Sequence, residues 1–193
     1  MQHPAYVGEW RMPSRGVVGM LGLITAESAI FTIFVVAYLY YTGTRVLHPS
    51  PREVLDVPIL ATVCLLSSSF FIWLAERAIH RGEIKLFALF WAITWLLGAI
   101  FLGYTAAEWH RLIYQEDFTV GTNVFSTAFY SLVGLHASHV IVGLLLILIV
   151  LLLTVFGKVR QEHAERIKVL AMYWHFVDAV WVVVFTVVYI VSR

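Results

Sequence analysis

The chain has 193 residues, of which 61% are hydrophobic and 13% are charged, and its formal net charge is +1. A soluble domain carries nearer a quarter of charged residues and does not place its apolar residues in runs of about twenty. The composition therefore indicates an integral membrane protein made of helices. The small net charge, with no basic block left over after the loops, excludes a nucleic-acid-binding surface.

The first apolar run extends from residue 16 to about residue 41, after an N-terminal segment, residues 1–15, that we place in the cytoplasm. Glu27 lies eleven residues after Gly16. At about 1.5 Å per residue, this is roughly the middle of the bilayer. Because a charged carboxylate is costly at that depth, we expect Glu27 to hold a proton or to pair with a histidine from another helix.

The second run covers residues 58–79, and Asp56 before it predicts an N-cap for its helix. Its three consecutive serines, residues 67–69, can bond to the preceding turn or reach a neighbouring helix. The third run covers about residues 84–109. Glu108 stands at its far end, so we place this carboxylate at the membrane interface and not in the core.

The fourth run, from about residue 124 to residue 156, exceeds the roughly twenty residues that cross a bilayer, so its helix must tilt or protrude. His136 and His139 lie in its first half and, being three positions apart, occupy adjoining parts of one face. Their depth makes either histidine a candidate partner for Glu27. We expect this pairing to serve the packing of the helices and not catalysis.

The fifth run covers about residues 169–191. His175, Trp174 and Trp181 lie three positions before, four before and three after Asp178, so all four share one face of the helix. Such a group indicates either a proton-active or ligand-binding site or a hydrogen-bonded network that fixes helix packing. We favour the packing network. We also expect Glu108 and the two tryptophans at helix ends or interfaces.

Buried histidines could also indicate a redox metal. Haem and copper sites need ligands directed at one point, whereas His136 and His139 are a single pair with no Cys or Met set beside them. The only cysteine, Cys64, lies in an apolar run without an intrachain partner. We therefore expect no metal site in this chain.

The basic residues predict the orientation of the five spans. Nine of the thirteen Lys and Arg residues fall on one side and the other four on the opposite side. The first group is Arg11, Arg15, Arg77, Arg81, Lys85, Lys158, Arg160, Arg166 and Lys168, and the second is Arg45, Arg52, Arg111 and Arg193. The larger group marks the cytoplasmic side, which places the N-terminus inside and the C-terminus outside.

Two stretches resemble subunit III of the haem-copper cytochrome oxidases in its short, five-helix form. Residues 173–181, YWHFVDAVW, are similar to the last helix of that family almost residue for residue. Residues 126–143 carry a similar aromatic pair, glycine and two histidines, although Ala137 and Ser138 depart from the family pattern. The resemblance is looser elsewhere and covers residues 17–191.

The resemblance implies a non-catalytic subunit of a proton-pumping oxidase that reduces oxygen to water in aerobic respiration. In that family the haems and copper lie in subunits I and II. Subunit III packs against subunit I, holds phospholipids in a cleft between helix groups, and sustains proton uptake and turnover. On this basis Glu27 is the buried carboxylate near the lipid cleft, and the helix group is held together by His136, His139, His175 and Asp178.

The same resemblance implies a multi-pass protein of the bacterial cytoplasmic (inner) membrane and leaves open whether the complex joins a larger respiratory supercomplex. It also leaves open the electron donor, cytochrome c or quinol. Two alternatives stay compatible with the sequence: a subunit III-like partner of a nitric oxide reductase, and a freestanding proton channel or transporter that uses Glu27, the histidines and Asp178. The chain contains no internal repeat, which weighs against a transporter built from repeats.

Overall fold

The computed structural model describes residues 13–43 and 55–191. Five of its helices are long and apolar enough to cross a membrane, which confirms the predicted all-helical membrane fold. They are α1 (Arg15–Gly43), α3 (Ile59–His80), α4 (Ile84–Tyr114), α5 (Val124–Val155) and α6 (Ala164–Phe185). A 3-10 turn, Gln161–His163, precedes α6, and a π-helical turn, Thr186–Val191, continues it.

The helix ends differ from the sequence-based prediction at three points. The second span begins at Ile59 without a side-chain cap, because Asp56 forms an ion pair with Arg111 instead. Helix α4 continues to Tyr114, since the polar turn after Glu108 remains helical outside the apolar run. Helix α6 likewise starts at Ala164, before its apolar run begins. These extensions follow from the fact that apolar composition marks the membrane-spanning part of a helix and not its full length.

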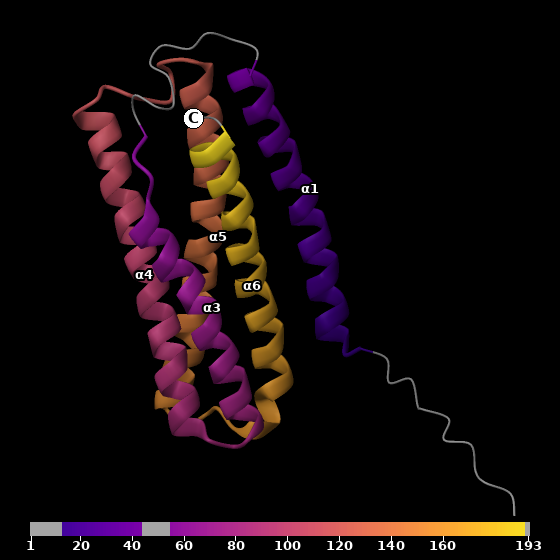
Figure 1. The fold of residues 1–193 in the computed structure, drawn as a ribbon. Coiled ribbons are helices and arrows are strands. Elements are labelled where there is room, and N and C mark those ends of the chain that lie inside the picture. The colour runs from indigo at the N-terminus through magenta and orange to yellow at the C-terminus, as the bar shows by residue number, and fades with distance from the viewer. Residues whose placement is uncertain (1–12, 44–54, 192–193) are drawn as a thin grey trace, which may run out of the picture.

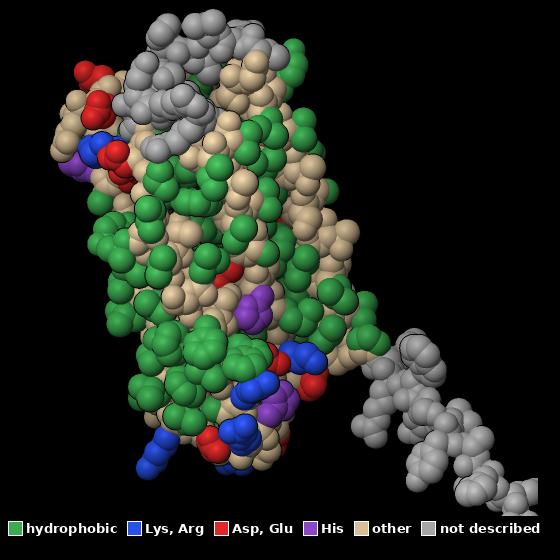
Figure 2. All heavy atoms as spheres, viewed as in Figure 1, with side chains coloured by type: hydrophobic (Ala, Val, Ile, Leu, Met, Phe, Trp, Pro, Cys, Tyr) green, Lys and Arg blue, Asp and Glu red, His purple; other side chains and the backbone are tan. Residues whose placement is uncertain are grey.

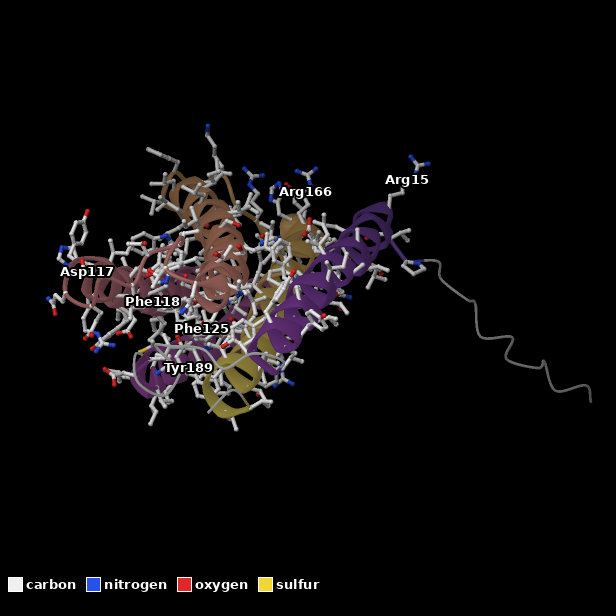
Figure 3. The ribbon with its side chains drawn as sticks, turned by 90° about the horizontal axis from the view of Figure 1, so that it is seen from above. Arg15, Asp117, Phe118, Phe125, Arg166 and Tyr189 are labelled. Carbon is white, nitrogen blue, oxygen red and sulfur yellow. The ribbon has the colours of Figure 1, made fainter. Side chains whose placement is uncertain are left out.

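Helices α3 and α4 form an antiparallel pair that is joined by a tight turn at Gly82, whose φ is +75°. Helices α5 and α6 pack against this pair, and α1 contacts chiefly α5 and α6. Figure 1 shows α1 at the edge of the bundle, and the view from above places it across the outside of α5 and α6 (Figure 3). The buried residues of α1 are Phe31 and Tyr38.

The charged residues lie mainly at the two ends of the bundle. Figure 2 shows Lys and Arg side chains at the end that holds the α3–α4 turn, whereas the middle of this face is largely apolar. Eight residues that we predicted for the cytoplasmic side belong to this end: Arg15, Arg77, Arg81, Lys85, Lys158, Arg160, Arg166 and Lys168. Arg11, Arg45, Arg52 and Arg193 lie outside the described residues.

The centre of the bundle is packed around Trp174, which is fully buried. A Cβ atom at Gly98 of α4 would lie 2.8 Å from Cη2 of this indole, and one at Gly143 of α5 would lie 2.8 Å from its Cε3. Small residues allow close approach in membrane helices. The two glycines thus form the notch that receives Trp174 and fixes how α6 sits against α4 and α5.

Candidate functional site

The first polar cluster inside the membrane-spanning helices joins α1 to α5. Nε2 of His139 lies 3.2 Å from Oε2 of Glu27, and Nδ1 of His139 lies 2.8 Å from the backbone oxygen of Leu135. A carbonyl can only accept, so Nδ1 carries a hydrogen and donates it. Nε2 then either accepts a proton from the carboxylic acid or, as part of an imidazolium, donates to the carboxylate. In either arrangement a hydrogen bond joins Nε2 of His139 to Oε2 of Glu27 and so links α5 to α1.

This pair lies on a crevice between α1, α5 and α6. The crevice has a volume of about 260 Å³ and is lined by Leu23, Glu27, Ser138, His139, Val142 and Tyr173. The phenol of Tyr173 donates a hydrogen bond to the backbone oxygen of His139 over 3.2 Å. Phe31 places its ring centroid 5.1 Å from that of His139. The pair is therefore held by three helices while remaining partly open.

The second polar cluster, which we call the Ser69 cluster, consists of Ser69 from α3 and His175 and Asp178 from α6. Oγ of Ser69 lies 3.0 Å from Nδ1 of His175 and is also hydrogen-bonded to Oδ2 of Asp178. Asp178 is 3% exposed, and its other oxygen, Oδ1, has no hydrogen-bond partner among the residues described. A single hydroxyl group thus connects the imidazole to the carboxyl group.

The two tryptophans of the same α6 face bond to α3 as well. Nε1 of Trp174 donates to Oγ of Ser68 over 2.8 Å, and Nε1 of Trp181 donates to Oγ1 of Thr62 over 3.1 Å. Both indoles, expected at helix ends or interfaces, are enclosed between helices. The run of serines indicated such contacts, but neither the role of Thr62 nor the bridging position of Ser69 could be read from the sequence.

His136 lies apart from both clusters. It is 1% exposed and stacks on Trp181 with 5.0 Å between the ring centroids. Phe101 meets it edge-on at 5.8 Å. Neither ring nitrogen of His136 has a hydrogen-bond partner within the described part of the chain. Of the two histidines that were candidates for Glu27, the structure brings His139 to it.

Glu108 is the remaining predicted site residue, and it lies near the end of α4. Its Oε1 accepts a hydrogen bond of 2.8 Å from Arg111, which also pairs with Asp56 at 2.9 Å. The Arg111 side chain is 30% exposed and that of Asp56 78%. Exposed ion pairs of this kind contribute little stability, so this group links a helix end to the connection before α3 without marking a reactive site.

The His, Cys, Asp and Glu side chains form no group of three or more that could hold a metal ion within residues 13–43 and 55–191. The chemistry that the two clusters offer is the exchange of hydrogen bonds and protons. His139 uses both ring nitrogens in hydrogen bonds, Nδ1 to Leu135 and Nε2 to Glu27, whereas His175 uses Nδ1 with Ser69 and keeps Nε2 as its remaining nitrogen.

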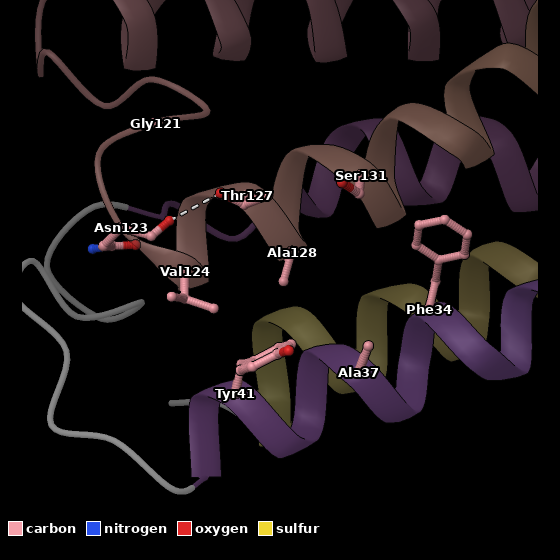
Figure 4. A pocket seen from close by; sticks show the side chains of 9 residues that line it. All are labelled: Phe34, Ala37, Tyr41, Gly121, Asn123, Val124, Thr127, Ala128 and Ser131. Carbon is pink, nitrogen blue, oxygen red and sulfur yellow. Dashed lines mark hydrogen bonds between the residues drawn. The ribbon is translucent and has the colours of Figure 1, made fainter.

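A larger groove lies between the last turns of α1 and the start of α5. Its volume is about 530 Å³, and it is lined by Phe34, Ala37, Tyr41, Gly121, Asn123, Val124, Thr127, Ala128 and Ser131. Figure 4 shows side chains of α1 facing the first turns of α5, with the polar Asn123 and Thr127 toward one end. The hydroxyl of Thr127 donates to the backbone oxygen of Asn123 over 3.2 Å, as the dashed line marks.

Comparison with known proteins identifies the family. Residues 14–193, which include all five helices, match the family model of cytochrome c oxidase subunit III. The chain belongs to this family. The chain thus combines five helices that are long and apolar enough to span a membrane with membership of a family of respiratory oxidase subunits. It is a multi-pass membrane protein.

Several relatives align over most of their length. Cytochrome c oxidase subunit 3 of Alkalihalophilus pseudofirmus is 34% identical over 177 residues, which are 91% of this chain and 86% of the relative. The protein of the same name from Bacillus sp. (strain PS3) is 35% identical, with 91% and 85% covered. Cytochrome bo(3) ubiquinol oxidase subunit 3 of Pseudomonas aeruginosa is 34% identical, with 86% and 78% covered. The percent identities to the two cytochrome c oxidase subunits and to the quinol oxidase subunit are thus similar, and the quinol oxidase subunit is matched over a smaller share of its length.

Proposed function

We propose that this subunit III chain is a non-catalytic accessory subunit of a proton-pumping haem-copper terminal oxidase, which reduces oxygen to water in aerobic respiration. The family match over residues 14–193 carries this proposal. In it the haems and copper belong to partner subunits, with subunit I as the main contact and subunit II as a further member. The intramembrane polar groups of this chain then connect its own helices and support the bundle on which the catalytic subunit rests.

We further propose that the chain holds phospholipid between α1 and α5. The 530 Å³ groove has apolar walls from both helices and hydrogen-bonding groups at one end, which suits an acyl chain with its head group near the membrane interface. The nearby crevice with Glu27 and His139 is lined by the same two helices together with α6. Lipid that fills these spaces would hold the lightly packed α1 in place during turnover.

The location that fits this function is the bacterial cytoplasmic membrane, with the N-terminus inside. The basic end of the bundle, which includes Arg15 at the start of α1 and Arg77 near the end of α3, supports this orientation by the positive-inside rule. The bacterial sources of the relatives support the membrane assignment.

The test is to purify the full chain with a tag from its native membranes, identify the chains that accompany it, and record a haem spectrum. We expect a haem-bearing oxygen reductase that loses endurance, measured as the ratio of late to initial turnover, when this chain is removed and regains it on addition. A stable isolated chain that binds haem would overturn the proposal. If the accompanying enzyme reduces nitric oxide, the chain is a subunit of that enzyme. If the purified chain alone conducts protons in liposomes and Glu27→Gln abolishes this flux, the chain is a channel or transporter.

A further inference from the structure

The Ser69 cluster has a feature that helix packing alone does not require. Asp178 is 3% exposed and its Oδ1 atom has no partner within the described part of the chain, so the carboxyl group depends on Ser69 for its hydrogen bond. A carboxylate with one unsatisfied oxygen is costly inside a membrane, and a proton on it removes most of that cost. The question is how such a proton reaches an enclosed group.

His175 supplies the route. It is only partly buried, and its Nδ1 atom faces Ser69 at 3.0 Å. Its Nε2 atom is neither hydrogen-bonded to a described residue nor among the enclosed unpartnered atoms. One nitrogen of this imidazole thus faces the interior chain of hydrogen bonds and the other faces outward.

We propose that Ser69 is a proton relay between the partly exposed His175 and the enclosed Asp178, which makes Asp178 a proton-holding site inside the membrane. When Asp178 holds no proton, the Ser69 hydroxyl donates to the Asp178 carboxylate, and Nδ1–H of His175 donates to Oγ of Ser69. Nε2 then has a free lone pair.

One proton that binds at Nε2 completes the exchange. The Nδ1 proton passes to Oγ of Ser69, and the hydroxyl proton of Ser69 passes to Oδ2 of Asp178. The result is a carboxylic acid that donates to Ser69, a hydroxyl that donates to Nδ1, and a hydrogen on Nε2. One proton has entered at Nε2 and one has been gained at Asp178, while every other group keeps its own number of hydrogens. Release follows the same steps in reverse.

The neighbouring ionisable groups favour proton exchange between His175 and the basic end of the bundle. Glu76 of α3, two helical turns from Ser69 in that direction, acts electrostatically on His175. The groups that face α6 from other helices are engaged elsewhere. His136 of α5 lies against Trp181, Glu108 of α4 is bonded to Arg111, and Glu27 of α1 pairs with His139.

The experiment measures the carbonyl stretching band of protonated Asp178 by infrared spectroscopy of the full chain in its purified membrane complex. Asp178→Asn assigns the band by removing it. On transfer to heavy water the band shifts as deuterium replaces the carboxyl proton. The rate of this exchange is compared among variants. We expect Ser69→Ala to slow this exchange on the order of tenfold or more, because exchange then needs local opening of the helices. We expect Ser69→Thr, which keeps the hydroxyl, to restore it.

Ser68→Ala is the matched control, since it removes the adjacent serine hydroxyl, which bonds to Trp174 and not to the relay. It should not slow the exchange, because Ser69 and His175 remain in place and any loosening of the contact between α3 and α6 would only speed it. His175→Gln is a second variant, for the case that Ser69→Ala does not assemble, and it should slow exchange similarly. Exchange at the wild-type rate in Ser69→Ala or His175→Gln would overturn the relay, as would the absence of a protonated Asp178 band across the pH range of stability. This inference does not depend on the proposed oxidase function.

Discussion

Nε2 of His139 lies 3.2 Å from Oε2 of Glu27, and this contact ties α5 to α1. Helix α1 buries only 6% of the residues in its most apolar window, far less than the other spans. A hydrogen bond between membrane helices contributes about 0.6 kcal/mol on average and up to about 1.7 kcal/mol. The Glu27–His139 pair is therefore a sizeable part of what positions α1, and the shape of the two grooves beside α1 depends on that position.

Glu27→Gln keeps a hydrogen bond to His139 but cannot share a proton with it. We expect the assembled complex and its initial turnover to stay within about twofold of wild type, since a neutral bond of about 1 kcal/mol remains. Activity should decline sooner during prolonged turnover, and less phospholipid should be retained. Subunit content, lipid phosphorus and the activity time course measure these effects. Ser28→Ala, which removes a hydroxyl bonded within α1, is the control. A fully assembled Glu27→Gln complex without initial activity would contradict this prediction.

Gly98→Ala should destabilise the bundle by about 1–3 kcal/mol, because overpacking forces Trp174 or Leu144 to move. The new Cβ would lie 2.8 Å from Cη2 of Trp174 and 2.9 Å from Cδ2 of Leu144. Gly103→Ala on the same helix is the control, since its Cβ meets nothing within 4 Å. The measurement is the thermal unfolding midpoint in one detergent. Equal midpoints for the two variants would show that Trp174 and Leu144 can move away from the new methyl group without loss of stability.

Ser68→Ala leaves the indole N–H of Trp174 buried without its acceptor, at a cost of about 1–3 kcal/mol. Trp174→Phe removes the donor and part of the ring volume. If the hydrogen bond stabilises the protein, the double variant should be less destabilised than the sum of the two single variants. Chemical or thermal unfolding of all four proteins measures this difference. Strict additivity would mean that the bond between α3 and α6 contributes nothing.

Asp178→Asn should lower the yield of assembled complex more than it lowers turnover per haem. The substitution introduces amide hydrogens next to an oxygen position that has no partner in the described structure, and an unsatisfied buried donor costs about 1–3 kcal/mol. Subunit content and the initial rate per haem measure the two effects. Ala179→Ser, at the exposed neighbouring position, should change neither. An inactive but fully assembled Asp178→Asn complex would contradict the structural part of this account.

Much of the arrangement follows from local spacing along the chain. The length of each apolar run predicted five spans, because a backbone in lipid must satisfy its own hydrogen bonds and forms a helix of about twenty residues or more. The helical period placed His175, Trp174 and Trp181 on one face with Asp178, and in the structure Ser69, Ser68 and Thr62 of α3 bond to that face. The ends of the helices were less well predicted, because polar residues continue a helix beyond the membrane.

The sequence by itself therefore determined the number of spans, their polar faces and the family resemblance. Only the tertiary structure decided that His139 meets Glu27 while His136 stacks on Trp181, and that Ser69 joins His175 to Asp178. The physical reason is that a pairing between helices depends on their rotation and relative height. Those are set by the packing of large side chains such as Trp174 into notches formed on other helices, and no local spacing records them.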